Sequence, residues 1–490
     1  QYLKQLQTDY LKTNKAGTNG FFYSAVSGDL GVQIRLNNLD SIRIQKKSKD
    51  PVFLVIDNGK VSYENGSELI GKSTSHKIRV LAEKYNDAAF AVIGPAAENY
   101  TRFGSIAVST SEQLRKKNKL MRFAGRGGMG TVMRDKNLYA IVIRGDKTNK
   151  FDVGNVKDMN LEMARGERTS KYRDYGTMFG NILSMEMLRA NVHNNFSRGS
   201  DERTEKLYME NLLNEGYEIN SLACQGCGIR CWKTIKDEQG KLKGKVDFEP
   251  GALLGLNLGI YNLDQIMTLV RIVDEMGMDA ITAGVSIGYL LEEENRFGDF
   301  EYIRKTLIEI GKGKHPLKEG VFRYSAGDSY KAMHVKGIEF AAYSGNLNPG
   351  NAFAIGGPHM TMDTYSRAWY TKAENTVNEW IDNVIVRGVN TVLYDFNGMC
   401  KFSKINFGDV TELFERVYGE KITTQELKDT ALNVYKQIRN LDQQLGFTQE
   451  DDVIPERCFE DLNLGLKHFL TKDFFTEFKK GVYDRGFALK

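Results

Sequence analysis

The chain has 490 residues, of which 41% are hydrophobic and 27% charged, and its formal net charge is only +4. This composition is typical of a globular protein, and a chain of this length divides into about two to four domains. The small net charge argues against a nucleic-acid-binding protein. No apolar run reaches the roughly 18 residues of a membrane helix, and we find no secretory signal at the start. We therefore expect a cytoplasmic protein.

The first part of the chain, up to about residue 155, is predicted to be rich in β-strands. Asn58-Gly59 favours a tight hairpin turn between strands at 52–57 and 60–64, because both residues tolerate positive φ. The other elements expected here are a helix at 76–85 and short apolar strands at 89–93 and 138–144.

After residue 155 the hydrophobic periodicity becomes helical. Residues 264–276 place four apolar side chains on one helix face, and 424–445 form a second amphipathic stretch. The predicted fold class is mixed α/β, with a β-rich base domain followed by two mainly α-helical domains. We place these domains at residues 1–155, 156–330 and 331–490.

Three of the five cysteines, Cys224, Cys227 and Cys231, lie within eight residues. A C-x-x-C turn followed by a third thiolate suits an iron–sulfur cubane. Structural zinc commonly uses two C-x-x-C pairs, and no second pair exists. A thioredoxin-type dithiol needs a βαβ context that is missing, and idle cysteines are seldom so close together. A 4Fe–4S cluster needs a fourth ligand, and from the spacing alone either Cys400 or Cys458 would serve.

Longer motifs occur in a fixed order along the chain, at 93–99, 124–130, 224–231, 247–249, 253–260, 274–279, 332–339, 354–359 and 395–400. Among them are Ala-Gly-Arg-Gly-Gly-Met-Gly at 124–130 and Asp-Phe-Asn-Gly-Met-Cys at 395–400. From about residue 20 to beyond residue 400, the chain resembles the aldehyde:ferredoxin oxidoreductase family in these motifs. On this resemblance it is identified as a member of that family.

The resemblance implies a set of cofactors. In this family two pyranopterin dithiolenes hold one tungsten, and the sequence does not distinguish tungsten from molybdenum. A Mg²⁺ ion bridges the pterin phosphates. The family pattern also chooses the fourth cluster ligand, so that one 4Fe–4S cluster is bound by Cys224, Cys227, Cys231 and Cys400, and Cys458 is a free thiol.

By the same resemblance, Asp279 and Asp395 match the two aspartates that bind the pterins. A carboxylate can accept hydrogen bonds from the amino and ring N–H groups of a pterin. Gly284 follows Asp279 by five residues, as Cys400 follows Asp395 by five, and this parallel favours the pterin role. Taken alone, Asp279 would be interpreted as the N-cap of a helix starting at residue 280. Gly284 and Met399, which belong to the same two segments, are also predicted to contact the cofactor.

Arg126 and Gly127 match the family segment near the pterin phosphates, where backbone N–H groups and a guanidinium suit an anion. Glu249 and His359 match the proton-handling pair of the family. Taken alone, Glu249 would be interpreted as a solvated carboxylate and His359 as a core histidine. Because Glu249 precedes Pro250, we expect it at the end of an extended segment.

The resemblance also predicts the reaction and the partners. It implies oxidation of a small aldehyde to a carboxylate, or the reverse, with ferredoxin or an iron–sulfur subunit as electron partner. A homodimer is compatible with it. The alternatives are a relative that reduces an aromatic acyl-CoA thioester and a non-catalytic electron-transfer or scaffold subunit. Family members usually carry a longer segment before the region of residue 20, so we expect a shortened base domain.

Overall fold

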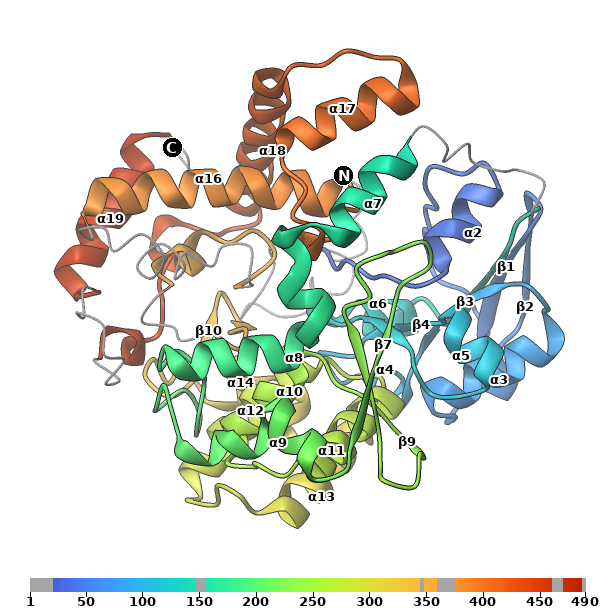
Figure 1. Ribbon diagram of the computed structural model, residues 1–490, viewed down its shortest axis with the longest axis horizontal. Coiled ribbons are helices and arrows are strands. Elements are labelled where there is room, and N and C mark those ends of the chain that lie inside the picture. Colours follow the sequence, from blue (N-terminus) through green and yellow to red (C-terminus); the bar gives the residue numbers. More distant parts are fainter. Residues whose placement is uncertain (1–20, 147–155, 344–347, 359–375, 461–469, 487–490) are drawn as a thin grey trace.

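The structure is a computed structural model, and it describes residues 21–146, 156–343, 348–358, 376–460 and 470–486. A β-sheet with its own helices forms one side of the molecule, and the remaining parts are mainly helical (Figure 1). The mixed α/β class predicted from the sequence is confirmed. No helix within these ranges is long and apolar enough to cross a membrane.

Six strands form one sheet in the order β2-β1-β6-β3-β4-β5. β1 and β6 run parallel, whereas all other neighbours are antiparallel. The strands are β1 Val52–Asp57, β2 Lys60–Asn65, β3 Ala89–Ile93, β4 Ile106–Val108, β5 Arg122–Ala124 and β6 Leu138–Arg144. The predicted hairpin is confirmed, and Asn58 and Gly59 adopt φ values of 49° and 79°, as a two-residue turn with positive φ requires.

Short helices accompany this sheet. They are α2 Leu30–Leu36, α3 Thr74–Lys84, α4 Pro95–Glu98, α5 Ser111–Lys116 and α6 Met129–Asp135. The apolar side chains of β1, β3 and β6 form a hydrophobic cluster whose buried members all lie between Phe53 and Ile143. The first part of the chain thus has a core of its own. The exact domain boundaries near residues 155 and 330 remain predictions.

The middle of the chain contains a three-stranded antiparallel sheet that we did not predict. Its strands are β7 Glu218–Leu222, β8 Trp232–Lys236 and β9 Leu242–Lys245. Lys233 is buried in β8, where its ammonium group donates to the Arg173 carbonyl at 2.7 Å and to the Ser221 hydroxyl at 2.6 Å. A buried lysine hides the alternation by which a strand is recognised. The sheet matters for function because the segment with three cysteines connects β7 to β8.

Helices surround this small sheet. They are α7 Lys157–Arg165, α8 Ser170–Met187, α9 Met209–Asn214, α10 Phe248–Leu253, α11 Leu263–Met276, α12 Ala280–Glu293, α13 Phe300–Gly311 and α14 Val321–Tyr324. The predicted amphipathic helix at 264–276 is confirmed as α11, and its four predicted core residues are buried. A short hairpin of β10 His334–Val335 and β11 Ile338–Glu339 follows.

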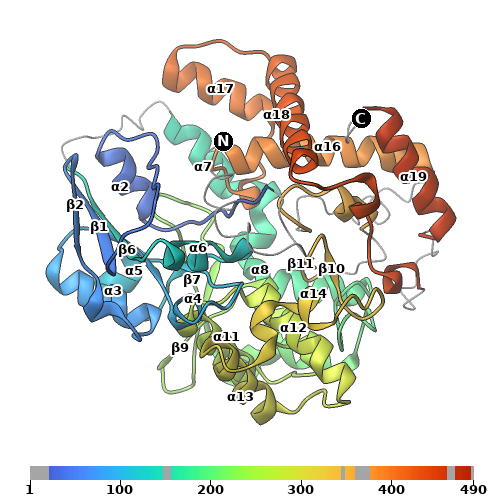
Figure 2. The ribbon, with the colours of Figure 1, turned by 180° about the vertical axis from the view of Figure 1, so that it is seen from behind.

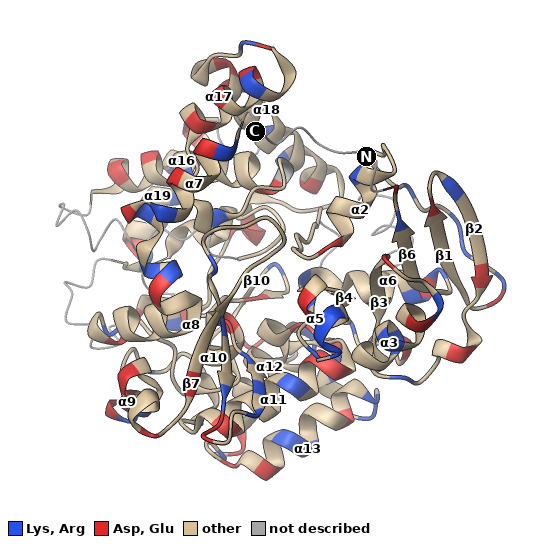
Figure 3. Cartoon of the chain, turned by 45° about the vertical axis from the view of Figure 1, so that its right-hand side comes forward, with Lys and Arg blue, Asp and Glu red and all other residues tan. Residues whose placement is uncertain are grey.

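The C-terminal helices are α16 Val377–Phe396, α17 Phe407–Tyr418, α18 Thr424–Gln444 and α19 Lys472–Asp484. α16 packs against α18 and α19, at the opposite side of the molecule from α11 and α13 (Figure 2). One large hydrophobic cluster extends from Phe21 through α10–α12 to Val482 of α19. Positive and negative side chains are interspersed over these elements (Figure 3), as the small net charge suggests.

Candidate cofactor site

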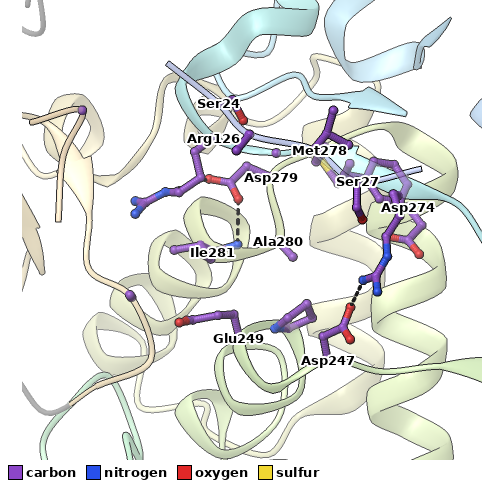
Figure 4. A pocket seen from close by; sticks show the side chains of 18 of the residues that line it. Ser24, Ser27, Arg126, Asp247, Glu249, Asp274, Met278, Asp279, Ala280 and Ile281 are labelled. Atoms are coloured by element: carbon purple, nitrogen blue, oxygen red, sulfur yellow. Dashed lines mark hydrogen bonds and ion pairs between the residues drawn. The ribbon is translucent and has the colours of Figure 1, made fainter. Parts of the chain in front are cut away.

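A cavity of about 400 Å³ lies where the sheet, helices α10–α12 and the end of α16 meet. The charged residues that line it are Arg122, Arg126, Lys245, Asp247, Glu249, Asp274, Asp279, Asp395 and Lys401. Residues 22–27 form a further part of the wall. Arg126 and Asp274 lie towards different ends of the opening (Figure 4). Residues from all three parts of the chain therefore contribute to one site.

The two helices that end at this cavity, α11 and α16, carry related short motifs that share the pattern Asp-x-x-Gly-Met. Asp-Glu-Met-Gly-Met-Asp spans residues 274–279, and Asp-Phe-Asn-Gly-Met-Cys spans 395–400. Asp274 lies in the last turn of α11 and Asp395 in the last turn of α16. Gly277 and Gly398, three residues on, have φ values of 70° and 65°, a conformation that favours glycine. The two motifs thus share their local backbone as well as their sequence.

This repeat changes the pairing of the acidic residues. The spacing to Gly284 predicts that Asp279 is the counterpart of Asp395. In the repeat, the counterpart of Asp395 is instead Asp274, and both of these residues line the cavity. Asp279 corresponds instead to Cys400, and each of these residues precedes the next helical segment as its N-cap. The repeat was visible in the sequence as Asp-x-x-Gly-Met followed by Asp or Cys.

Asp274 presents a carboxylate to the cavity without a protein partner. Within the part of the chain that the structure describes, no hydrogen-bond donor contacts this carboxylate. Burial raises its pKa to about 7, and Lys245 opposes that increase. A desolvated carboxylate without a donor is costly, so a ligand that supplies N–H groups fits this position.

Asp395, the second aspartate, is held in place by two neighbours. The Tyr23 hydroxyl donates to it at 2.5 Å, and the Lys401 ammonium lies 3.2 Å from its other oxygen. Burial and the Asp395 charge raise the pKa of Tyr23 well above its usual value, so the phenol remains a donor. Since Tyr23 and Lys401 also line the cavity, this carboxylate has a fixed position at its wall.

Asp279 is the N-cap of α12, which was the simpler of the two interpretations. Its oxygens accept hydrogen bonds from the backbone N–H groups of Ile281 at 3.1 Å and Thr282 at 3.3 Å. Its carboxylate also lies 3.7 Å from Nε of Arg126. The capping role does not remove Asp279 from the cavity wall. Its predicted contact with a pterin stays a prediction.

Arg126 extends along the same wall. Its two terminal nitrogens donate to the carbonyl oxygens of Glu339 and Pro358. Its Nε atom is buried and has no hydrogen-bond partner among the described residues. The guanidinium is thereby fixed by backbone carbonyls, which do not neutralise its positive charge, and the Asp279 carboxylate 3.7 Å from Nε partly balances that charge.

Glu249 faces this cavity from α10. Its carboxylate accepts a hydrogen bond from the Ala342 N–H at 2.6 Å, and burial raises its pKa to about 7, with Arg126 acting against the increase. We expected an extended backbone here, and this was wrong, because Glu249 lies in the first turn of α10. Pro250 is tolerated there, since the first N–H groups of a helix have no intrahelical acceptor.

The other predicted cofactor residues have different locations. Gly127 lines a smaller neighbouring cavity of about 80 Å³. Gly284 packs against Leu253 of α10, where a Cβ atom would lie 2.6 Å from the Leu253 carbonyl oxygen. Met399 donates its N–H to the Tyr394 carbonyl at 2.8 Å and does not line the main cavity. His359 lies outside the described residues.

The cysteine segment lines a separate cavity of about 710 Å³. The Cys227 N–H donates to the Cys224 carbonyl at 3.0 Å, which forms the expected turn. Desolvation raises the pKa of the Cys400 thiol, and Cys224 and Cys227 raise it further. Cys400 is therefore close to the other cysteines, although it is some 170 residues away in sequence. Cys458 is buried elsewhere, at 1% exposure.

No three His, Cys, Asp or Glu side chains in the described ranges converge on one metal position. A cubane takes one thiolate at each iron, so its four ligands surround it at a distance from one another.

Arg122 connects the two cavities. Its guanidinium stacks on Trp232, 3.7 Å from the ring centre, and pairs with Asp247 at 2.8 Å. Trp232 lines the cysteine cavity, whereas Arg122 and Asp247 line the main one.

Residues 12–145 match the N-terminal domain of aldehyde ferredoxin oxidoreductase, and residues 155–485 match its domains 2 and 3. The chain belongs to the aldehyde ferredoxin oxidoreductase family. The N-terminal domain of the family is thus present, although we expected it to be shortened.

Individual relatives are distant but extend over most of the chain. A tungsten-containing aldehyde ferredoxin oxidoreductase of Pyrococcus abyssi is 27% identical, over 92% of this chain and 80% of the relative. The WOR-like subunit of an aliphatic sulfonate oxidoreductase of Pyrococcus furiosus is 26% identical, over 91% and 77%. The active site complex of benzoyl coenzyme A reductase with 1,5-dienoyl-CoA has the same fold, with a TM-score of 0.74, 18% identity, and coverage of 96% of this chain and 82% of that one. The two relatives and the protein with the same fold are named for different reactions.

Proposed function

We propose that this chain is a tungsten–pterin oxidoreductase that oxidises an aldehyde to a carboxylate, or catalyses the reverse. The observation that carries the proposal is the pair of Asp-x-x-Gly-Met motifs at the ends of α11 and α16. Two like motifs that present Asp274 and Asp395 to one cavity suit a cofactor with two like halves. The sequence identity of about 27% to tungsten-containing relatives agrees with it.

The cavity walls provide the groups that such a cofactor needs. Asp274 and Asp395 would each accept hydrogen bonds from one pterin. The fixed guanidinium of Arg126 would bind the pterin phosphates together with a Mg²⁺ ion. Molybdenum would fit the same residues, because the pterins and not the protein would hold the metal.

The second motif ends in Cys400, which lies close to Cys224 and Cys227. We infer that these three residues and Cys231 bind one 4Fe–4S cluster. Because Asp395 and Cys400 belong to the same six-residue segment, the cofactor half at Asp395 would lie beside the cluster. This gives the electrons a short path towards ferredoxin or an iron–sulfur subunit.

Side chains of the protein would transfer the protons of the reaction. Aldehyde oxidation by water yields a carboxylate, two electrons and three protons, and the bound cofactor supplies the two-electron acceptor. Glu249 has a pKa of about 7 and a carboxylate oriented by the Ala342 N–H, so it can exist in either protonation state near neutral pH. We assign it the removal of a proton from the attacking water. His359 is proposed as the partner that polarises the aldehyde oxygen.

Metal analysis of the purified protein tests the cofactor assignment. One tungsten or molybdenum for about four irons, as a single cubane gives, supports it. Iron without tungsten or molybdenum would contradict it and favour an electron-transfer or scaffold subunit. Reduction of ferredoxin with a panel of aliphatic and aromatic aldehydes then tests the reaction. Glu249→Gln and His359→Asn should retain the metals and lose roughly 10²–10⁴ in rate.

A further inference from the structure

Two buried carboxyl groups lie on either side of one hydroxyl at the start of α12. The Thr282 hydroxyl oxygen is 2.7 Å from an Asp279 carboxylate oxygen and 2.9 Å from a Glu339 carboxylate oxygen. All three residues are buried, with exposures of 3% for Asp279, 6% for Thr282 and 3% for Glu339. In this row of three side chains, the function proposed above uses neither Thr282 nor Glu339.

The number of hydrogens constrains this arrangement. A threonine hydroxyl has one hydrogen to donate, and an ionised carboxylate has none. If both carboxyl groups were ionised, one of the two short contacts would contain no hydrogen. Both become hydrogen bonds when Glu339 carries a proton and donates to Thr282, which donates to Asp279. Burial raises the pKa of Glu339 to about 7, in agreement with this state.

The row has one end in each of two cavities. Asp279 lines the main cavity, and Glu339 lines the neighbouring cavity of about 80 Å³. At roughly 30 Å³ each, that volume holds two or three water molecules. Its wall includes the ion pair of Arg102 and Glu319, whose side chains are 22% and 38% exposed. The row therefore spans the distance between the main cavity and a small cavity that has partly exposed charged side chains in its wall.

The charged groups around Glu339 are compatible with proton transfer. Arg126 donates to the Glu339 backbone carbonyl and lowers the pKa of its side chain, whereas Asp279 raises it. His334, the cross-strand neighbour of Glu339, has its pKa lowered to about 4 by burial and is neutral near pH 7. The other ionisable groups around the small cavity are Arg102, Glu319 and Arg323.

We propose that Asp279, Thr282 and Glu339 form a proton relay between the main cavity and the small cavity. This inference rests on the proposed function, because aldehyde oxidation releases protons that must leave a buried site. In each passage, Glu339 first releases its proton to water in the small cavity, and the Thr282 hydroxyl turns to donate to the ionised Glu339 carboxylate. Asp279 accepts one proton from the main cavity. This proton then passes to the Thr282 oxygen as the Thr282 hydroxyl hydrogen passes to Glu339. No electrons are transferred, and each group returns to its original protonation state.

Three variants of the holoenzyme and one control test the relay. Thr282→Val removes the hydroxyl and preserves the shape, Thr282→Ser restores a hydroxyl, and Glu339→Gln removes the titrating group. Ser286→Ala is the matched control, because Ser286 is a buried hydroxyl one turn further along α12 and has no hydrogen-bond partner among the described residues. The readouts are the infrared C=O band of a neutral carboxyl group, aldehyde turnover and the solvent deuterium isotope effect.

Glu249 and Asp274 also have pKa values of about 7, so the Glu339 band is identified in the difference spectrum between the wild type and Glu339→Gln. This difference band is expected to disappear as the pH rises through about 7. Thr282→Val should shift this band and reduce turnover by about tenfold or more, with a larger isotope effect. Thr282→Ser and Ser286→Ala should resemble the wild type.

Normal turnover and an unchanged isotope effect in Thr282→Val would overturn the relay. The absence of the Glu339 band would overturn it independently of activity, and this readout remains available if Thr282→Val does not fold. If the wild type oxidises no aldehyde but shows the band and its shift in Thr282→Val, the hydrogen-bonded row stands and the proposed reaction fails.

Discussion

Because Glu339 is buried, the stability of the fold should depend on pH in a predictable direction. Burial raises the pKa of this carboxyl group from 4.5 to about 7. In the unfolded chain the group ionises near 4.5, whereas in the folded protein it stays neutral up to about 7. Its contribution is therefore full below pH 4.5, decreases as the pH rises to 7, and is lost above that. At roughly 1.4 kcal/mol per pH unit, the loss is about 3 kcal/mol.

Denaturant unfolding of the wild type and Glu339→Gln at a series of pH values measures this effect. Glutamine resembles the neutral acid and does not titrate, so the difference in unfolding free energy isolates residue 339. From about pH 5 to about pH 8, the variant should gain about 2 to 3 kcal/mol relative to the wild type. Glu68→Gln, at an exposed glutamate, is the control. A difference for Glu339→Gln that stays constant within about 0.5 kcal/mol across this range would refute the reasoning.

Three further predictions concern the cluster, the pterins and the base. Cys400→Ser should weaken or abolish the visible absorption of the cluster, whereas Cys458→Ser should leave it intact, and the reverse result would show that the wrong fourth ligand was chosen. Asp274→Asn should lower the tungsten content measured by elemental analysis, and a normal tungsten content in this variant would contradict the pterin-binding role of Asp274. Asp279→Ala should in addition lower the free energy of unfolding by about 1 kcal/mol, because the N-cap of α12 is lost. The rate of aldehyde oxidation should rise with pH through about 7 as Glu249 ionises, and a profile with no group near 7 would exclude it as the base.

The sequence predicted the features that depend on local patterns. The Asn58-Gly59 hairpin, α11 and α12 follow from turn chemistry and from hydrophobic spacing. Each of these features is decided by neighbours within a few residues. The approach of Cys400 to the C-x-x-C segment needed the family pattern in addition, because no local rule chose between Cys400 and Cys458.

The roles of the acidic residues of the site could not all be predicted from sequence spacing. The five-residue spacing from Asp279 to Gly284 equals that from Asp395 to Cys400, but an alignment on this spacing does not superpose the glycine with positive φ that lies inside each motif. Glu339 was not considered, because its partner Thr282 is 57 residues away and a buried carboxyl group has no periodic pattern. Only the tertiary structure shows that the two side chains meet.

The two related motifs differ at their last position, and this difference agrees with both proposals. Each motif ends a helix, turns at a glycine and then caps the next helical segment. In one motif the final residue is Cys400, which lies close to Cys224 and Cys227 and, as a ligand of the proposed cluster, would pass on electrons. In the other it is Asp279, which contacts Thr282 and through it Glu339, and which can pass on protons. Aldehyde oxidation releases both, so a site with two similar halves gains by having a thiolate on one side and a carboxylate on the other. On this reasoning, the two motifs differ at their sixth residue, Asp279 in one and Cys400 in the other, because protons and electrons leave the site by different routes.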